Sequence, residues 1–465
     1  MVKLREQQDV ILCFSISFRK IDCSGEGTVS GTRQKSLYIN ASRFNFFCHA
    51  RRISMASVVQ WSIKIATKSI GPATFCMPNN QKFFHYRKVT IKSAYFVNMP
   101  ITRLLIEDFI TQSQGQPVFD VRSPAEYEHA HIPSANNLPL FSNEERKVVG
   151  TAYKQESKQR AIKIGLEYFG PKMVKMVEEV EQMIEARGAK EKKQQEDRSV
   201  FVYCWRGGMR SAGVAWLLDL YGFKVYTLVG GYKAYRNWVL KQFEKEYPIS
   251  IIGGYTGSGK TETLHRLHTM KEAVLDLEGI ACHKGSAFGN LGQPVQPKQE
   301  MFENLLAARL YELMVLQQAE HIWTEDESQR IGEVNIPIRL YSFLRTRSLY
   351  FMDIPFEERL NYIAEQYGQF EKDKLISATI RIQKRLGGLE TKTAVNCLLE
   401  NDIKGAFAIL LKYYDRFYNK SMHNQRENVD LLMHKIAIET VNPVVNAEQV
   451  KKVHRSKAVI SPASL

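Results

Sequence analysis

The sequence of 465 residues contains no uninterrupted run of about 18 or more apolar residues, the length that a membrane-spanning helix requires. We therefore predict no transmembrane segment and no membrane partner. Hydrophobic residues make up 44% of the chain and charged residues 24%, proportions typical of a soluble globular protein. A chain of this length is expected to form two or three domains.

Cysteine is scarce, with seven residues in the whole chain. Three of them, Cys204, Cys282 and Cys397, are far apart and none belongs to a CxxC pair. This spacing excludes a disulfide scaffold and a zinc cluster, and it favours the reducing cytoplasm. We assign no metal to His283 beside Cys282, because adjacent residues rarely bind one ion; His283 is expected near the phosphate site instead. The other four cysteines lie in the first 98 residues: Cys13, Cys23, Cys48 and Cys76.

Acidic residues are scarce in residues 1–98, which hold fifteen Lys/Arg and four Asp/Glu, whereas the remaining residues hold 49 and 45. Most of the net charge of +15 thus lies in one segment, and the high overall pI is weak support for nucleic-acid binding. The segment has three interpretations: an organellar transit segment, a disordered basic arm, or a start assigned too far upstream of Met99. We favour the third, since the arginine-rich amphipathic periodicity of a transit segment is missing.

The remaining sequence alternates apolar strands with helical periods, which predicts an α/β fold with parallel sheets. We expect a first α/β domain at residues 99–240, a second at 245–354 and a helix-rich C-terminal region at 355–465. In the first domain the expected strands and helices are Pro117–Val121, Gly165–Arg187, Ser199–Tyr203, Ser211–Tyr221 and Lys224–Leu228. Beyond it they are Ile249–Ile252, Thr261–Met270, Val274–Leu277, Gln299–Ala319, Ile322–Thr324, Phe356–Gln366, Leu375–Leu386 and Ala406–Tyr418.

A cysteine ends the strand Ser199–Tyr203 and opens the run Cys-Trp-Arg-Gly-Gly-Met-Arg-Ser, residues 204–211, which we call the thiol loop. Backbone N–H groups and the start of the following helix favour the thiolate, the nucleophilic form. Arg206 and Arg210 favour it further and can bind an anionic substrate. We predict Cys204, Arg206 and Arg210 as catalytic residues, in a nest suited to a persulfide, a perselenide or an oxyanion.

Upstream of the thiol loop, a run around Asp120 and Arg122 resembles the opening signature of rhodanese domains, a family in which residues at these two positions are mainly structural. The spacing Cys204-x5-Arg210 is one residue longer than the commonest rhodanese loop and equals that of cysteine-dependent phosphatases. A phosphatase therefore remains an alternative, as does an inert buried thiol. The matching strings are Phe119–Pro124, Glu126-Tyr127 and His131–Ala135.

A second glycine-rich run has the complete P-loop pattern G-x4-G-K-T, residues 254–261, between a predicted strand and a predicted helix. We call it the phosphate loop; it indicates a diphosphate or triphosphate without specifying a nucleotide. Lys260 is expected to neutralise the terminal phosphate and the Thr261 hydroxyl to bind Mg²⁺ carried by that substrate, with no tightly bound cofactor. Glu325 is the predicted acid on the magnesium side, Asp326 is nearly as suitable, and a solvated acidic cluster is the alternative. The predicted phosphate-binding residues are Gly254, Gly257, Ser258, Gly259, Lys260 and Thr261.

Together the two loops resemble the bacterial tRNA 2-selenouridine synthase family, in which a rhodanese domain is fused to a P-loop domain. The likeness runs from about Met99 to Ser421, and the five-residue spacing of the thiol loop matches this family too. Further matching strings are Asp276–Gly279, His283–Gly289, Gln293-Pro294, Glu325–Ser328, Arg385–Gly388 and Tyr413–Asp415.

The resemblance implies a transferase that replaces sulfur by selenium at the wobble uridine of certain tRNAs. A 2-thiouridine is first S-geranylated from geranyl diphosphate, and selenium from selenophosphate then displaces the geranylthio group. We place the diphosphate in the phosphate loop, and we expect Cys204 to accept selenium as a perselenide. The implied partners are the tRNA anticodon region, both small substrates and the synthase that makes selenophosphate.

Two other hypotheses stay open: a phosphatase or ATP-dependent enzyme with a sulfur-carrying thiol domain, and a non-catalytic sulfur carrier or scaffold. For tRNA contacts we select a run that interleaves cations with aromatic rings, although a solvated helix face is the plain alternative. Lys384 and Arg385 are expected to add backbone contacts. The selected residues are Arg339, Arg345 and Arg347 with Tyr341, Phe343 and Tyr350.

Overall fold

The computed structural model describes residues 101–191 and 198–460, together with four short strands nearer the start of the chain. The strands pair as two antiparallel ladders, β1 (Ile11–Phe14) with β2 (Leu37–Asn40) and β3 (Thr74–Phe75) with β4 (Phe84–His85). The interpretations of residues 1–98 otherwise lie outside the described residues. Residues 101–465 form a compact unit of their own, in which every described helix is too short or too polar to cross a bilayer.

The first domain, here called the thiol domain, contains a parallel sheet of five strands in the order β5-β9-β8-β6-β7. Its central strand β8 is buried along its whole length, which explains its unbroken apolar sequence. The carboxyl ends of parallel strands meet at one edge of a sheet, so the thiol loop after β8 opens at that edge. The strands are β5 (Thr102–Leu104), β6 (Val118–Asp120), β7 (Asn136–Asn137), β8 (Ser199–Tyr203) and β9 (Lys224–Leu228).

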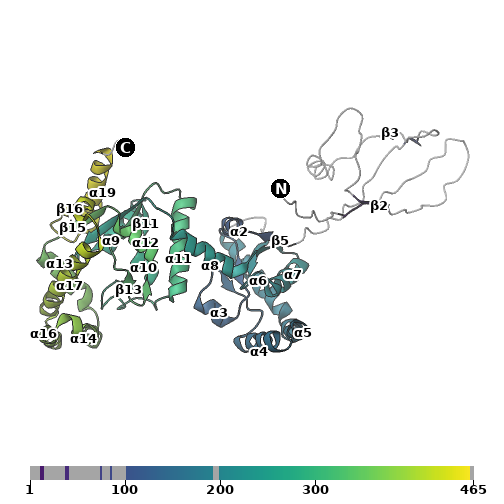
Figure 1. The fold of residues 1–465 in the computed structure, drawn as a ribbon, viewed down its shortest axis with the longest axis horizontal. Coiled ribbons are helices and arrows are strands. Elements are labelled where there is room, and N and C mark those ends of the chain that lie inside the picture. Colours follow the sequence, from purple (N-terminus) through teal and green to yellow (C-terminus); the bar gives the residue numbers. More distant parts are fainter. Residues whose placement is uncertain are drawn as a thin grey trace, which may run out of the picture. The chain divides into compact units, whose positions relative to one another are not determined.

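Helices cover both faces of this sheet (Figure 1): α2 and α8 contribute to the apolar cluster on one face, α6 and α7 to that on the other. The helix predicted at Gly165–Arg187 is divided in two by a short 3-10 turn, Gly170–Lys172. Pro171 explains the break, since its ring removes a backbone donor and clashes with a preceding turn. The helices are α2 (Ile106–Gln112), α3 (Pro124–His129), α4 (Asn143–Gln155), α5 (Lys158–Phe169), α6 (Met173–Glu191), α7 (Met209–Tyr221) and α8 (Gly231–Gln242).

The second domain, here called the P-loop domain, has another parallel sheet in the order β11-β12-β10-β15-β16. The phosphate loop leaves the carboxyl end of its central strand β10, where ligands of open α/β sheets bind. This confirms the predicted α/β class for both domains. The strands are β10 (Ile249–Gly254), β11 (Ala273–Leu275), β12 (Ile322–Glu325), β15 (Leu349–Asp353) and β16 (Met433–Ala437); β13 (Arg330–Ile331) and β14 (Val334–Asn335) form a separate ladder.

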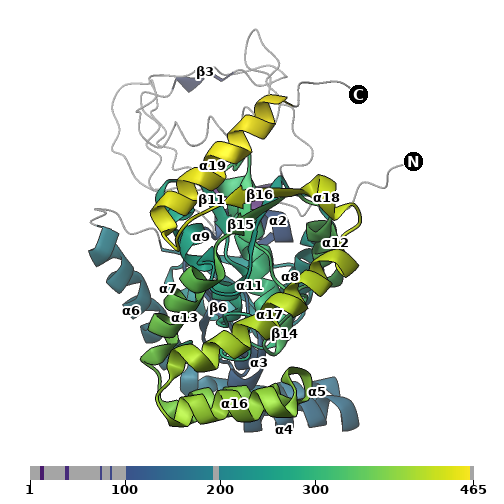
Figure 2. The same ribbon diagram turned by 90° about the vertical axis from the view of Figure 1, so that its left-hand side faces the viewer.

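Helices α9 (Lys260–Thr269) and α19 (Pro443–Ile460) cover one face of the second sheet (Figure 2), and α11 (Gln299–Tyr311) and α12 (Ile338–Arg345) cover the other. The helix predicted at Gln299–Ala319 stops being α-helical at Tyr311 and continues as one π-helical turn. A short helix, α10 (Leu277–Ala281), follows β11.

The C-terminal region is helix-rich as predicted, but the helices do not follow the sheet as a separate region. Six of them lie in the chain between β15 and β16, β16 then pairs with β15 as the edge strand, and α19 follows β16. The predicted boundary at residue 354 therefore falls inside the P-loop domain. The helices are α13 (Phe356–Gly368), α14 (Lys372–Arg381), α15 (Gln383–Leu386), α16 (Gly388–Leu399), α17 (Ile403–Gln425) and α18 (Val429–Leu432).

A polar cluster joins α8 of the thiol domain to α11 of the P-loop domain. The Tyr232 hydroxyl donates to Glu300 (2.8 Å), and Arg236 donates to the side-chain oxygen of Asn304 (2.6 Å). Asn304 is fully buried and donates to the backbone carbonyl of His131 (2.8 Å). Buried polar groups that are satisfied in this way fix one register of the two helices.

Candidate active sites

Cys204 lies at the end of β8 with 3% of its surface exposed. Its sulfur is 3.2 Å from the hydroxyl oxygen of Ser211, the last residue of the thiol loop. That hydroxyl donates its proton to the carbonyl of Gly208 (3.1 Å). Its oxygen is therefore left to accept from the Cys204 thiol, which orients the sulfur inside the loop.

Two glycines let the thiol loop pack against the start of α8. Gly207 has φ +63°, and a side chain there would meet the carbonyl of Leu228 at 2.4 Å. Gly231 has φ +58°, and a side chain there would meet the carbonyl of Cys204 at 2.2 Å. The Tyr232 N–H donates to that same carbonyl (2.8 Å). Both positions thus require glycine for conformation and for close approach.

The two predicted arginines of the thiol loop have different environments. Arg210 donates to the carboxylate of Glu126 (2.7 Å), which also faces Arg146 at 3.6 Å. Burial alone would raise the pKa of Glu126, but its bond with Arg210 and the nearby positive charges hold that pKa below its ordinary value. Arg206 is exposed at the surface of the loop. An incoming anion would therefore meet the exposed charge of Arg206 and the partly neutralised charge of Arg210.

Asp120 and Arg122 form a buried ion pair, with the Arg122 Nε 2.9 Å from one carboxylate oxygen. Arg122 also donates to the carbonyl of Ala130 (2.7 Å), and its guanidinium lies 3.9 Å from the ring centre of Tyr232. Both side chains are almost fully buried. These contacts agree with the structural role predicted for the pair.

The phosphate loop curls around the start of α9. Gly257 and Gly259 have φ of +84° and +69°, and Lys260 extends back so that its Nζ donates to the carbonyl of Gly254 (3.0 Å). Five of the six predicted phosphate-binding residues line a common pocket, whereas Gly254 ends β10 behind it. The arrangement presents backbone N–H groups, a helix N-terminus and an ammonium group to one anion.

Carboxylates line the side of the phosphate loop where Mg²⁺ is expected, but the acid that contacts Thr261 is not the predicted Glu325. The Thr261 hydroxyl donates to Glu278 (2.6 Å), and the Glu278 N–H donates to Glu325 (2.8 Å). Glu325 is 1% exposed and lies behind Glu278, and burial with the charges of Asp276 and Glu278 raises its pKa well above the ordinary value. Glu327 lines the pocket, and its pKa is raised by burial and by Glu278. Glu278, which the motif alone does not identify, is thus the acid beside Thr261.

The oxygen donors at this point fit Mg²⁺. One carboxylate oxygen of buried Glu325 has no hydrogen-bond partner among the residues that the structure describes, so the cluster can accept a further bond. Within residues 101–191 and 198–460, no three His, Cys, Asp or Glu side chains are grouped to hold a metal by themselves. A magnesium ion characteristically uses one or two protein oxygens and completes its shell with water and substrate phosphate. Thr261 and Glu278 are the residues that would hold it.

Asp326, the alternative magnesium acid, is occupied by other partners. It accepts from Arg345 (2.7 Å), Arg426 (2.6 Å) and the Tyr418 hydroxyl (2.6 Å). Burial opposes ionisation, but the two guanidinium groups outweigh it and hold the pKa of Asp326 far below its ordinary value. This network fixes the wall of the pocket, and the two guanidinium groups already neutralise the charge of Asp326, which is therefore not available to a metal.

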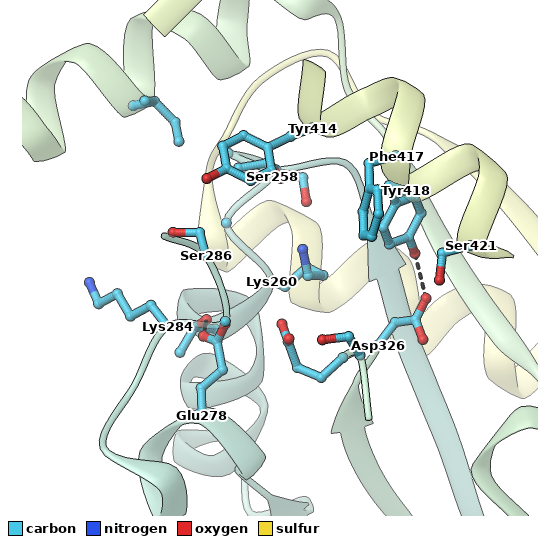
Figure 3. A pocket seen from close by; sticks show the side chains of 18 of the residues that line it. Ser258, Lys260, Glu278, Lys284, Ser286, Asp326, Tyr414, Phe417, Tyr418 and Ser421 are labelled. Carbon is cyan, nitrogen blue, oxygen red and sulfur yellow. Dashed lines mark hydrogen bonds between the residues drawn. The ribbon is translucent and has the colours of Figure 1, made fainter. Parts of the chain in front are cut away.

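The pocket in front of the phosphate loop has a volume of about 230 Å³. Figure 3 shows Lys260 between a polar side with Glu278 and Lys284 and an aromatic side with Phe417 and Tyr418. A cavity with one polar side and one aromatic side suits a diphosphate that carries a hydrocarbon group. The apolar and aromatic lining residues are Tyr362, Ile363, Tyr367, Tyr414, Phe417, Tyr418 and Met422.

The residues selected for tRNA contact do not share one exposed face. Arg345 points into the Asp326 network, and Tyr341 and Tyr350 are buried. Arg339 is exposed and lies 3.7 Å from Glu244, while Arg347 stacks on Phe343 at 4.5 Å. The alternation of cations and rings reflects α12 burying one side against the sheet.

Two further predictions concern single residues or short runs. His283 is 8% exposed, and burial lowers its pKa, but it does not line the phosphate pocket. Lys384 and Arg385 are exposed on the short helix α15.

Known proteins resemble both domains. The family model described as the tRNA 2-selenouridine synthase AAA domain matches residues 247–451, and that of the rhodanese-like domain matches residues 105–237. A tRNA 2-selenouridine synthase from a Sulfurovum species is 32% identical over 67% of this chain and 90% of its own length. The one from Nitrosomonas europaea is 36% identical over 54% of this chain and 63% of its own length.

A solved structure from Clostridium difficile 630, the N-terminal domain of a protein described as ATP/GTP-binding, is 37% identical over 30% of this chain and 99% of its own, with a TM-score of 0.25. The two family models together account for the thiol domain and for the P-loop domain up to α19. The chain belongs to the tRNA 2-selenouridine synthase family.

Proposed function

We propose that this enzyme converts a wobble 2-thiouridine of tRNA to 2-selenouridine through an S-geranyl intermediate. The observation that carries the proposal is the pocket in which the phosphate loop faces an aromatic wall. A nucleoside triphosphate has no apolar group beside its terminal phosphates that such an aromatic wall could bind. Geranyl diphosphate needs both surfaces, one for its pyrophosphate and one for its isoprenoid chain.

In the first step the sulfur of 2-thiouridine attacks C1 of geranyl diphosphate. A carbon–sulfur bond forms, the carbon–oxygen bond breaks, pyrophosphate leaves and the base loses one proton. The negative charge develops on the departing oxygen, where Lys260 and the N–H groups of the phosphate loop stabilise it. Mg²⁺ held by Thr261 and Glu278 would supply further charge neutralisation when bound.

In the second step selenium from selenophosphate replaces the geranylthio group at C2 of the base. Overall, the S-geranyl nucleoside, selenophosphate and water give 2-selenouridine, geranyl thiol and phosphate. We assign this step to the thiol domain, with Cys204 as its reactive sulfur and Arg206 and Arg210 as the groups that attract the anionic donor. The perselenide expected on Cys204 is not an intermediate of this balance, because selenium in selenophosphate is already at the selenide level and a perselenide would need an oxidant. The buried Cys204 sulfur and the exposed Arg206 support this division. Both substrates and tRNA are expected in the cytoplasm, with the selenophosphate synthase as a partner.

The test is mass spectrometry of nucleosides after incubating the protein with 2-thiouridine-bearing tRNA, geranyl diphosphate and selenophosphate. We expect the S-geranyl nucleoside with the first donor alone and 2-selenouridine when both are present. Absence of both products would refute the proposal. Release of orthophosphate from an aryl phosphate without tRNA would support the phosphatase alternative instead.

A further inference from the structure

Helix α17 carries three cations on one exposed stripe, Lys412, Arg416 and Lys420. They are spaced four residues apart and therefore lie on one side of the helix, along about 12 Å of its axis. The acid of this part of the helix, Asp415, is bound by the buried Arg359 (2.8 Å) and does not balance them. We call these three residues the α17 stripe.

The α17 stripe is unfavourable for an isolated helix. Like charges four residues apart repel by a few tenths of a kcal/mol per pair, whereas an ordinary solvated face alternates both signs. No ion pair joins Lys412, Arg416 or Lys420 to an acid within the part of the chain that the structure describes. A surface of one sign with this spacing matches a polyanion.

Two aromatic residues, the half-buried Tyr413 and the exposed Phe417, adjoin the stripe on the side toward the pocket. Tyr413 and Phe417 follow it around the helix at steps of about 100° per residue, and their rings stack at 6.4 Å. Phe417 is 50% exposed although it lines the phosphate pocket. Tyr414 and Ser421 continue around the same helix into that pocket, as Figure 3 shows. One helix therefore presents cations, then aromatic rings, then the lining of the reaction pocket.

We propose that α17 docks the single-stranded anticodon loop of tRNA, with its phosphates along the α17 stripe and a splayed base on Phe417 at the mouth of the pocket. This inference rests on the proposed function, and it moves the RNA contact away from Arg339, Arg345 and Arg347. Single-stranded RNA suits the surface because an unstacked base can lie on an aromatic ring while cations hold its backbone. The sulfur of that base would then face the donor held by the phosphate loop.

The experiment measures binding of 2-thiouridine-bearing tRNA to the full chain, without donors, over a range of salt concentrations. A variant with Lys412→Gln, Arg416→Gln and Lys420→Gln should bind at least tenfold more weakly at 0.1 M salt. The slope of log affinity against log salt should flatten by about 2, since each single-strand phosphate contact contributes about 0.7. Geranyl diphosphate should bind this variant as it binds the wild type, which shows that the pocket is folded.

The matched control removes three exposed charges from the thiol domain: Lys147→Gln, Lys154→Gln and Lys163→Gln. It should leave the affinity within about twofold and the slope nearly unchanged. A control that weakens binding as much as the stripe variant would show that total charge matters, and would overturn the proposal. Unchanged affinity and slope in the stripe variant would also overturn it, while product formation by the wild type would still uphold the proposed function.

The aromatic contact is tested by Phe417→Leu, which keeps an apolar side chain at the pocket mouth. Loss of base stacking should weaken tRNA binding roughly tenfold and leave the salt slope unchanged, because no phosphate contact is removed. A slope that flattens together with the affinity would contradict the assignment of Phe417 to a base. If wild-type protein binds tRNA but forms neither product, the proposed function fails and the docking surface stands.

Discussion

The thiol loop and the phosphate loop share the same kind of backbone arrangement but lie in different surroundings. Each follows the buried central region of a parallel sheet, each leads into a helix, and each relies on glycines with positive φ. The thiol loop itself carries the exposed side chains of Trp205, Arg206 and Met209. The phosphate loop lies in a pocket with buried carboxylates and an aromatic wall.

We infer that each loop motif provides a place for an anion and that the surrounding residues select the reaction. We propose that the thiol loop meets a small anionic donor at its exposed rim, beside the buried Cys204 sulfur. A departing pyrophosphate needs charge neutralisation and an apolar place for its former hydrocarbon partner. The second loop has both in one cavity of about 230 Å³.

The largest effects are expected from variants that stop the reaction of one loop and leave the reaction of the other loop intact. Lys260→Ala should slow geranylation about 10²- to 10³-fold, the size of effect expected for removing a group that stabilises the leaving charge, and should leave selenation of pre-geranylated tRNA within twofold. Cys204→Ser should abolish selenation and leave geranylation intact. Both rates are measured by nucleoside mass spectrometry. Loss of geranylation in Cys204→Ser would refute the division of labour.

The next effect concerns the buried ion-pair network of Asp326 in the wall of the phosphate pocket. Asp326→Asn should lower the free energy of unfolding by about 3 kcal/mol or more, because it leaves two buried guanidinium groups without their carboxylate. Urea unfolding measures the change. The control is Asp353→Asn, which breaks the exposed pair with Lys435 and should cost less than about 1 kcal/mol. Equal costs would show that the network has no structural role.

Each domain also contains a half-buried histidine, and the two should differ in their response to acid. Burial and then the neighbouring His454 lower the pKa of His321 from 6.5 to about 4, whereas burial lowers that of His131 less. Between pH 6.5 and 4 the unfolded His321 binds a proton that the folded one does not. Its stabilising contribution is therefore complete above pH 6.5 and falls as the pH drops.

From this shift we expect a loss of about 2 kcal/mol in unfolding free energy between pH 7.5 and pH 5. His321→Gln should remove most of that pH dependence, and His131→Gln should remove less. Urea unfolding at the two pH values measures both. A pH dependence that persists in His321→Gln would assign it to another group.

The sequence predicts the strands that carry the two loops because they are continuous apolar runs next to glycine-rich motifs, as at Ser199–Tyr203 and Ile249–Ile252. It does not predict β16, since the sequence Met-His-Lys-Ile-Ala is that of a half-exposed edge strand with no apolar run. Glu278 is missed for another reason: its place beside Thr261 depends on the short helix α10, which follows β11, lying against the phosphate loop, and the motif does not specify that packing. A sequence motif identifies the local backbone conformation. The residues that contact the motif are determined by how the rest of the chain folds around it.

The smallest effect tests how far Glu126 neutralises the thiol loop. Glu126→Gln should lower the KM for selenophosphate about threefold at low salt, because Arg210 regains a full positive charge while glutamine still accepts its hydrogen bond. Glutamine also preserves the capping box in which Glu126 accepts the Ser123 N–H (3.1 Å), so α3 should keep its stability. Geranylation should not change, since Glu126 belongs to the thiol domain. A KM that rises, or that stays the same at every salt concentration, would show that Arg210 orients the loop without attracting the donor.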